Sequence, residues 1–160
     1  MQNNKIRRKD RAITDYQQML DIMRQCDVCR LGFQEAQGVY ILPLNFAFKQ
    51  FDDRLELYFH GHKKGKKIDL IQQQKIVGFQ MDRKHEIVHA DIACHYSFRY
   101  QSIIGKGEIS LLEDQTEKIT ALQHLMAHYT NKSDWQFEEN ELNRIAVMKL
   151  VVTEWACKEH

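Results

Sequence analysis

The segment of residues 58–71 holds the densest group of side chains that could bind a ligand. A predicted strand there gives way to a turn with two glycines and four lysines, and a short helix follows at once: Gly61, Gly65, Lys63, Lys64, Lys66 and Lys67. The N-terminus of a helix offers unpaired N–H groups and a partial positive charge, and both favour a phosphate. Lysines beside those amides add further positive charge. The pattern favours a site for a dianionic monophosphate over the alternative, a solvated basic turn.

Two other features of the predicted strands are compatible with an embedded ligand. Pro43 interrupts an otherwise regular strand, which indicates an edge strand or a bulge. Gly105 and Gly107 alternate in a long strand, where they would let a flat ring approach the backbone. A bend in a barrel explains these two glycines equally well.

Two short motifs have the spacing of metal ligands but lack the surrounding elements that a metal site needs. Residues 85–89 read His-Glu-Ile-Val-His, the pattern of zinc proteases, but that site needs a helix and this segment follows a predicted strand without a capping signal. A solvated loop is the favoured interpretation. Cys26 and Cys29 form a CxxC pair, and the only further thiols are the distant Cys94 and Cys157. The pair is therefore interpreted as two ordinary thiols at a helix-to-strand junction.

Two further histidine pairs have close spacing. His124 and His128 stand four residues apart on a predicted helix, but both fall off its apolar stripe, so we expect them to face solvent. His60 and His62 have like parity in a predicted strand, which places both rings on one side of it. No metal site is predicted from these residues.

The elements that must position these residues are short strands separated by turns and helices. Alternating apolar residues predict strands over residues 30–36, 39–48, 54–60, 75–82, 100–112 and 145–153. Capping-box spacing predicts helices that begin at Thr14 and after Asp114, and a short helix covers residues 68–73. Two-residue turns favour antiparallel meanders over βαβ units. The chain is predicted to be mainly β (α+β), a small barrel with peripheral helices.

Two of these elements show a clear apolar face. In the strand of residues 54–60, one face holds Leu55, Leu57 and Phe59, and the opposite face holds Glu56, Tyr58 and His60. In the helix after Asp114, the apolar stripe consists of Ile119, Leu122, Met126 and Tyr129. In each of these elements the listed apolar side chains share one face.

Composition narrows the class of protein. The chain has 160 residues, of which 43% are hydrophobic and 28% charged, as expected for one compact domain over residues 1–160 with a flexible basic arm at 1–12. The net charge of +1 argues against a nucleic-acid partner. No apolar run approaches the ~20 residues that span a bilayer, so no membrane partner is expected. Without a signal-peptide pattern, the cysteines are expected to be reduced and the protein cytoplasmic.

Several motifs occur in an order that resembles a known family. They are Arg7-Arg8-Lys9-Asp10-Arg11, Arg30-Leu31-Gly32-Phe33, Tyr40-Ile41-Leu42-Pro43-Leu44-Asn45-Phe46, the segment of residues 58–71, and Tyr100-Gln101-Ser102-Ile103-Ile104-Gly105-Lys106-Gly107. Together, over roughly residues 6–152, they resemble the nitroimidazole-resistance (Nim) and related flavin-binding proteins of the pyridoxamine-5'-phosphate-oxidase-like superfamily.

The resemblance implies a six-stranded antiparallel split β-barrel with peripheral helices, of the FMN-binding type, in a homodimer that holds two FMN molecules at its interface. Lys66 and Lys67 would contact the FMN phosphate. The family histidine near the flavin and the substrate matches His60. The implied cofactor-binding residues are Leu42, Pro43, Leu44, Asn45, Phe59, His60, Gly61, Lys66 and Lys67, with Tyr100, Gln101 and Ser102 reaching the flavin from the partner subunit.

The chain departs from the superfamily pattern at three places. His62 stands where the family usually has a small residue, which would narrow the pocket or add a ligand. Residues 153–160 contain no arginine, and the strand around Pro43 lacks one as well. Pyridoxamine-phosphate oxidases proper use arginines at both places, so that specific activity is not expected.

The implied function is an FMN-dependent oxidoreductase that acts on a small molecule, such as a nitroaromatic or nitroimidazole-type compound. His60 would be the catalytic residue, donating a proton or polarising the nitro group. The alternative is a non-catalytic flavin- or haem-binding protein for storage or sensing, because several histidines could serve as axial haem ligands: His60, His62, His85, His89 and His95. A nucleic-acid-binding domain is disfavoured by the charge balance.

Overall fold

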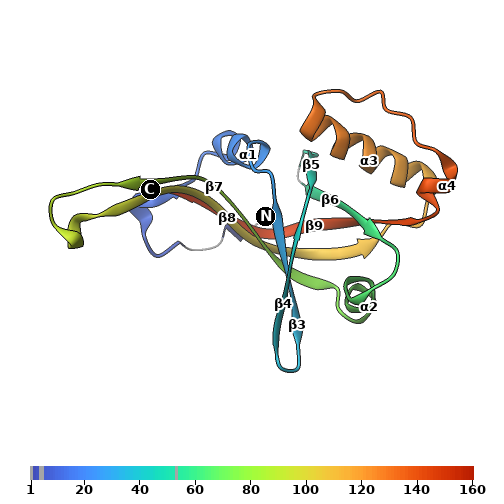
Figure 1. The fold of residues 1–160 in the computed structure, drawn as a ribbon, viewed down its shortest axis with the longest axis horizontal. Coiled ribbons are helices and arrows are strands. Elements are labelled where there is room, and N and C mark those ends of the chain that lie inside the picture. Colours follow the sequence, from blue (N-terminus) through green and yellow to red (C-terminus); the bar gives the residue numbers. More distant parts are fainter. Residues whose placement is uncertain (1, 4–5, 53) are drawn as a thin grey trace.

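The computed structural model describes residues 2–3, 6–52 and 54–160. Its main feature is a twisted sheet in which neighbouring strands follow the order β4-β3-β7-β8-β9-β6-β5 (Figure 1). These strands are β3 (Cys29–Glu35), β4 (Gly38–Leu44), β5 (Ala47–Gln50), β6 (Leu55–His62), β7 (Ile76–Val88), β8 (Ser97–Leu111) and β9 (Ile145–Glu159). Every neighbouring pair along this order is antiparallel.

The remaining elements lie around this sheet. Two short strands, β1 (Gln2–Asn3) and β2 (Ala12–Ile13), pair with β9. The helices are α1 (Tyr16–Arg24), α2 (Lys66–Gln73), α3 (Gln115–Thr130) and α4 (Glu139–Leu142), with 3-10 turns at Lys9–Arg11 and Ala93–His95. In the described part of the chain, no helix is both long enough and apolar enough to cross a membrane.

The predicted class, mainly β and antiparallel with peripheral helices, is confirmed, although the sheet has nine strands where six were predicted. One cause is the stretch 39–48, which breaks at Asn45 and Phe46 into β4 and β5. These two strands lie at opposite ends of the strand order. Phe46 turns its ring into the core, where it is fully buried, and its N–H donates to the Tyr129 hydroxyl at 3.0 Å instead of continuing the ladder.

The larger hydrophobic core fills the curve of the sheet beneath α1. It gathers side chains from every long strand and from α1, among them Met23, Leu31, Phe33, Leu57, Phe59, Met81, Ile103, Met148, Leu150 and Trp155. A second core lies between α3 and the opposite face of β5 and β6, and it contains Ala47, Tyr58, Leu112, Ala121, Leu122, Leu125, Leu142 and Val147. Strand β6 is therefore buried on both of its faces over most of its length.

The face of β6 opposite Leu55, Leu57 and Phe59 is also buried at two positions. Glu56 is 2% exposed and Tyr58 is 7% exposed, because α3 packs over them. The stripe predicted for this helix is also displaced. Its buried residues are Ala121, Leu122 and Leu125, whereas Tyr129 keeps 40% of its surface exposed.

Helix starts agree with the sequence to within a few residues. Before α3, the Asp114 side chain accepts the Glu117 N–H at 2.9 Å, as the capping spacing predicted. Helix α1 begins after Asp15, whose side chain accepts the Gln18 N–H at 2.7 Å, so the predicted cap at Thr14 is one residue too early. Helix α2 begins two residues earlier than predicted, directly after the glycine of its turn.

The long β7–β8 hairpin corrects two other interpretations. Residues 85–89, expected as a solvated loop, fall largely on β7, which shifts register between Arg83 and Glu86. The His85 ring stacks on Phe98 at 6.0 Å, and its Nε2 lies 2.5 Å from Asp82. The helix that a zinc protease needs does not form here, and within the described ranges no three His, Cys, Asp or Glu side chains converge on a metal position.

The alternating glycines of β8 serve packing within the protein. A Cβ on Gly105 would stand 2.4 Å from Cζ of Phe79, and one on Gly107 would stand 2.3 Å from the Val151 carbonyl oxygen. The ladder with β9 shifts register between Lys106 and Gly107. The space of each missing side chain is thus filled by the protein itself, and the register shift supports a bend in the sheet as one reason for these glycines.

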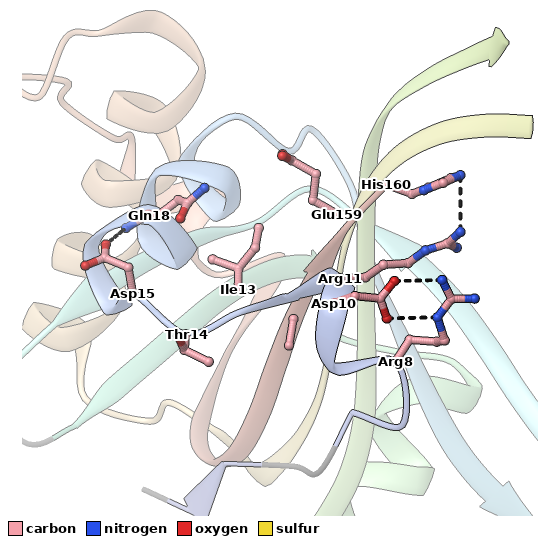
Figure 2. A pocket seen from close by; sticks show the side chains of 10 residues that line it. Arg8, Asp10, Arg11, Ile13, Thr14, Asp15, Gln18, Glu159 and His160 are labelled. Carbon is pink, nitrogen blue, oxygen red and sulfur yellow. Dashed lines mark hydrogen bonds and ion pairs between the residues drawn. The ribbon is translucent and has the colours of Figure 1, made fainter.

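The basic arm lies against the sheet where it is described. Ala12 and Ile13 pair with the end of β9, and Figure 2 shows the cleft between the arm and Glu159. The Arg8 guanidinium donates to both carboxylate oxygens of Asp10, at 2.9 and 2.7 Å. Met1, Asn4 and Lys5 lie outside the described residues.

Candidate functional site

The turn between β6 and α2 brings glycine, lysine and a helix N-terminus together. Gly65 adopts φ +115°, a left-handed conformation that favours glycine, and α2 begins at the next residue. Where a Cβ would project from Gly61, the Lys67 side chain runs instead, with its Cε only 2.7 Å from that position. The lysine therefore crosses the end of β6 beside the first turn of α2, whose leading N–H groups have no partners within the helix.

The two lysines predicted to hold a phosphate have different surroundings. Lys66 is exposed, yet its Nζ lies 2.9 Å from a Glu35 carboxylate oxygen and 4.8 Å from the centre of the Tyr40 ring. It joins α2 to the β3–β4 hairpin. Lys67 is half-buried over Gly61, and within the described chain its Nζ forms no ion pair. Lys67 is thus the lysine whose charge is more available to an anion.

His60 lies on β6, two residues before the strand ends at His62 and the turn begins. Its ring has an exposed surface, and desolvation by the surrounding protein lowers its pKa below the usual value, so the neutral form predominates at neutral pH. His62 projects from the same side two residues on, and its Nδ1 accepts the Lys64 N–H at 3.2 Å. Phe59 is fully buried in the core, so only its backbone is open to a ligand.

The segment from Leu42 to Asn45 runs along the edge of the sheet, since β4 is the first strand in the order. The edge position that Pro43 predicted is confirmed, and this proline pairs with Arg30 of β3. Leu42 and Leu44 pack against the larger core. The exposed face of this segment is therefore formed by Pro43 and Asn45.

A hydrogen-bonded bridge that the sequence did not reveal holds the end of this segment. The Tyr129 hydroxyl accepts the Phe46 N–H at 3.0 Å and donates to the Asp27 carbonyl at 2.7 Å. Its neighbour His128 places Nε2 3.0 Å from the Cys26 carbonyl oxygen. The end of α3 thereby ties residues 26–27 to the break between β4 and β5. The only sequence signal was a His-Tyr pair at the end of a helix, which is too common to be specific.

The interpretation of His124 and His128 as solvent-facing is wrong. The His124 ring stacks on Tyr58 at 5.7 Å, and the His128 ring packs at 4.9 Å from Phe46. Both become half-buried because α3 lies on β5 and β6. The CxxC thiols, by contrast, are ordinary as predicted: both are free and buried, and burial raises the pKa of Cys26 to about 11.

Tyr100, Gln101 and Ser102 lie at the opposite end of the sheet from the lysine turn. Along β8, the seven steps from Ser102 to Ile109 span about 23 Å at the usual rise of a strand. The Gln101 side-chain oxygen accepts a hydrogen bond from the Arg83 guanidinium at 2.7 Å, and its amide nitrogen donates one to the Glu159 carboxylate. The Ser102 hydroxyl is buried and has no hydrogen-bond partner among the described residues. Within one chain, the structure does not bring these residues to the turn.

The outer face of the sheet between these two places is apolar and open. Large side chains with more than two-fifths of their surface exposed include Val39, Ile41, Ile76 and Ile104. A shallow hollow of about 350 Å³ lies in this face. Its lining consists of Val39, Ile41, Phe79, the glycines Gly32, Gly78 and Gly105, and the polar residues Arg30 and Gln80. Exposed apolar patches of this kind commonly mark interaction surfaces.

Solved structures share this architecture. A candidate 5-nitroimidazole antibiotic resistance protein from Bacteroides thetaiotaomicron aligns with a TM-score of 0.80 and 29% identity, over 92% of this chain and 86% of that chain. Two more distant structures show the same fold. The flavocytochrome Anf3 from Azotobacter vinelandii has a TM-score of 0.80 and 18% identity, over 98% of this chain and 72% of that chain. The FAD and haem binding protein from Mycobacterium smegmatis has a TM-score of 0.78 and 16% identity, over 93% of this chain and 73% of that chain.

These similarities and a match to a family model together define the class of the protein as a split β-barrel of the pyridoxamine-5'-phosphate-oxidase-like type, which confirms the resemblance seen in the sequence. A family model described as pyridoxamine 5'-phosphate oxidase matches residues 15–159. The chain belongs to the pyridoxamine 5'-phosphate oxidase family. No curated protein sequence matches it.

Proposed function

We propose that the protein is an FMN-dependent oxidoreductase that works as a homodimer and reduces small nitro compounds. The observation that carries this proposal is the placement of Lys67 across Gly61 at the N-terminus of α2. A half-buried ammonium beside unpaired helix N–H groups is the donor set that a phosphate monoester needs. Riboflavin 5'-phosphate carries such a group.

The other predicted contacts fit a flavin only if two chains share it. Tyr100, Gln101 and Ser102 lie too far along β8 to meet the lysine turn of their own subunit. The open apolar face, with Ile41 and Ile104 exposed, would be covered by a second copy of the chain. The buried Ser102 hydroxyl without a partner supports a ligand or a second subunit at that end of the sheet.

In this proposal the chain's own residues divide the work. Lys67, Lys66 and the first N–H groups of α2 hold the phosphate, and Leu42–Asn45 lies beside the ring, fixed from behind by Tyr129. The flavin, when bound, supplies the electrons. His60 is neutral at neutral pH because its pKa is lowered, so it acts by donating an N–H hydrogen bond to the substrate.

The substrate class follows from similarity and from what the chain lacks. The relative from Bacteroides thetaiotaomicron is named for 5-nitroimidazole resistance, and it is 29% identical to this chain. Residues 153–160 carry no arginine for a substrate phosphate. The arginines of the arm that approach this end are engaged, since Arg8 pairs with Asp10 and Arg11 with His160 at 3.2 Å. Turnover of pyridoxamine phosphate is therefore not proposed.

An anaerobic titration tests this function. Protein loaded with FMN is reduced chemically, and a 5-nitroimidazole is then added while the flavin absorbance is followed. The proposal expects the oxidised flavin spectrum to return in proportion to the nitro compound added. Bound flavin that stays reduced would instead favour a storage or sensing role, and a sharp Soret band in the purified protein would favour haem.

A further inference from the structure

A groove between α1, β5 and α3 carries positive charge that its own lining does not balance. Basic side chains reach it from all three elements: Arg24 from α1, Lys49 from β5, and His124 and His128 from α3. Figure 1 shows β5 between the two helices. Among the described residues that line the groove none is Asp or Glu, and the other polar side chains are the amides Gln17, Gln50 and Asn131. Its volume is about 470 Å³.

Two other clefts have a lining of mixed charge. In the cleft of Figure 2, Asp10 and Glu159 accompany Arg8 and Arg11. The cavity beneath Phe51 combines basic and acidic side chains, namely Arg54, Lys149, Glu56, Asp114 and Glu117. The hollow on the outer face of the sheet has no acidic lining either, but its one basic side chain, Arg30, pairs with Asp82 at 2.7 Å. The groove over β5 differs from all three because it holds a lysine without a carboxylate partner in the described structure.

Lys49 is the centre of the unbalanced charge. It forms no ion pair with any residue that the structure describes. Glu56 faces it across the β5–β6 ladder, but that carboxylate already accepts the Tyr58 hydroxyl at 2.5 Å and lies 2.9 Å from Nε of Arg54. Arg24, on the opposite wall, pairs with Asp21 of its own helix. Lys49 is therefore the charged side chain of the groove that has no carboxylate partner among the described residues.

Two histidines line the groove together with Lys49. His124 is stacked on Tyr58, and its pKa is lowered by burial and then by the charge of Lys49. His128 uses Nε2 toward the Cys26 carbonyl, and its ring packs against Phe46, Phe48 and Tyr129. A negative charge beside the His124 ring would oppose the effect of Lys49 and favour protonation of that ring.

We propose that this groove binds a small amphipathic organic anion. Its carboxylate or phosphate group would lie between Lys49 and His124, and its apolar body would rest on Leu20, Phe48 and Ala127, which also line the groove. The site is separate from the lysine turn of α2, so this proposal does not depend on flavin binding.

Benzoate is the probe for the first test, and benzamide is its uncharged match. The ring signals of His124 and His128 are followed by NMR while each compound is added. Benzoate is expected to shift both rings saturably and to bind about tenfold more tightly near pH 6 than near pH 8, because binding takes up a proton. Benzamide is expected to cause no saturable shift. Equal binding of the two compounds, or no saturable shift with benzoate, would overturn the proposal.

Three lysine variants locate the site. Lys49→Gln should weaken benzoate binding about tenfold, the usual cost of losing one charge-assisted hydrogen bond. Lys75→Gln removes an exposed lysine elsewhere and should change nothing. Lys66→Gln, in the proposed flavin site, should leave benzoate binding intact and weaken the binding of FMN. Benzoate binding that survives Lys49→Gln but is lost in Lys66→Gln would contradict the new site and leave the flavin proposal standing.

Discussion

The Lys67 side chain occupies the space that a side chain on Gly61 would need, with Cε 2.7 Å from the position of the missing Cβ. The two residues come from β6 and α2, so glycine at the end of the strand is what allows the lysine to cross it. This relationship gives a structural reason for the spacing of glycine and lysine in the turn. It also predicts that Gly61 matters through Lys67.

Replacing Gly61 by alanine should therefore weaken FMN binding by displacing Lys67. Lys67→Gln should weaken FMN binding to a similar extent. The expected loss of affinity is about tenfold or more, because each of the two substitutions removes one charge-assisted contact to the phosphate. Riboflavin, which lacks the phosphate, should bind all variants equally. Isothermal titration of the apo-protein with both flavins measures this. The matched control is Lys64→Gln in the same turn, since Lys64 is exposed.

The role of His60 can be separated from cofactor binding. His60→Ala should retain FMN but lose turnover of a nitro compound by about a hundredfold, within the usual range for a group that donates a proton or hydrogen bond. His60→Asn, which keeps an N–H donor, should recover part of the rate. Steady-state rates with flavin occupancy measured in the same samples decide the matter. Full turnover in His60→Ala would remove this residue from the mechanism.

Much of this arrangement could be predicted from local sequence, because local rules govern it. Asp114 caps α3 as its spacing indicated, and Pro43 lies on an edge strand because proline cannot donate to a ladder. The glycine-lysine turn was found from composition and order alone. In each case the deciding interaction lies within a few residues of the signal.

What the sequence did not predict depends on contacts between distant elements. The burial of Glu56 and the packing of His124 follow from α3 lying on β6, some sixty residues further along the chain. The segment 85–89 becomes strand because β8 pairs with it. The Tyr129 hydroxyl bridges Phe46 and Asp27, which precede it in the sequence by 83 and 102 positions. Periodicity within one segment contains no information about such partners.

The bridge through Tyr129 should contribute to stability. Tyr129→Phe keeps the ring but leaves the Phe46 N–H and the Asp27 carbonyl without this hydroxyl, so the free energy of unfolding should fall by about 1–2 kcal/mol. Urea denaturation followed by fluorescence measures the change. Tyr96→Phe is the control, because that exposed tyrosine makes no side-chain hydrogen bond within the described structure. Equal stability of the two variants would show that the bridge contributes nothing.

Stability should decline on mild acidification, and His124 should be one cause. Its pKa in the folded protein is lowered by burial and by Lys49, so the unfolded chain binds the proton more readily. The contribution is fully present above the unfolded value near 6.5 and is lost as the pH falls through the folded value. His124→Phe should show a flatter decline between about pH 7 and about pH 5. An unchanged pH profile would exclude this residue as a cause.

The proposed homodimer places Ile41 in the interface. Ile41→Asp introduces a charge on an open apolar face where the native side chain is 61% exposed, so the folded monomer should tolerate it. Light scattering should show a dimer for the native chain and a monomer for the variant, and the variant should also lose FMN. Ile92→Asp, at the tip of the β7–β8 hairpin, tests whether any new charge on an exposed apolar side chain has this effect.

The most direct test of the central claim is the absorbance spectrum of the purified protein, with the released chromophore identified by mass. The account predicts two flavin bands, in the blue and the near ultraviolet, and the mass of FMN. If the protein is colourless, added FMN should restore these bands. A colourless protein that fails to take up FMN would contradict the assignment of the lysine turn as a flavin phosphate site.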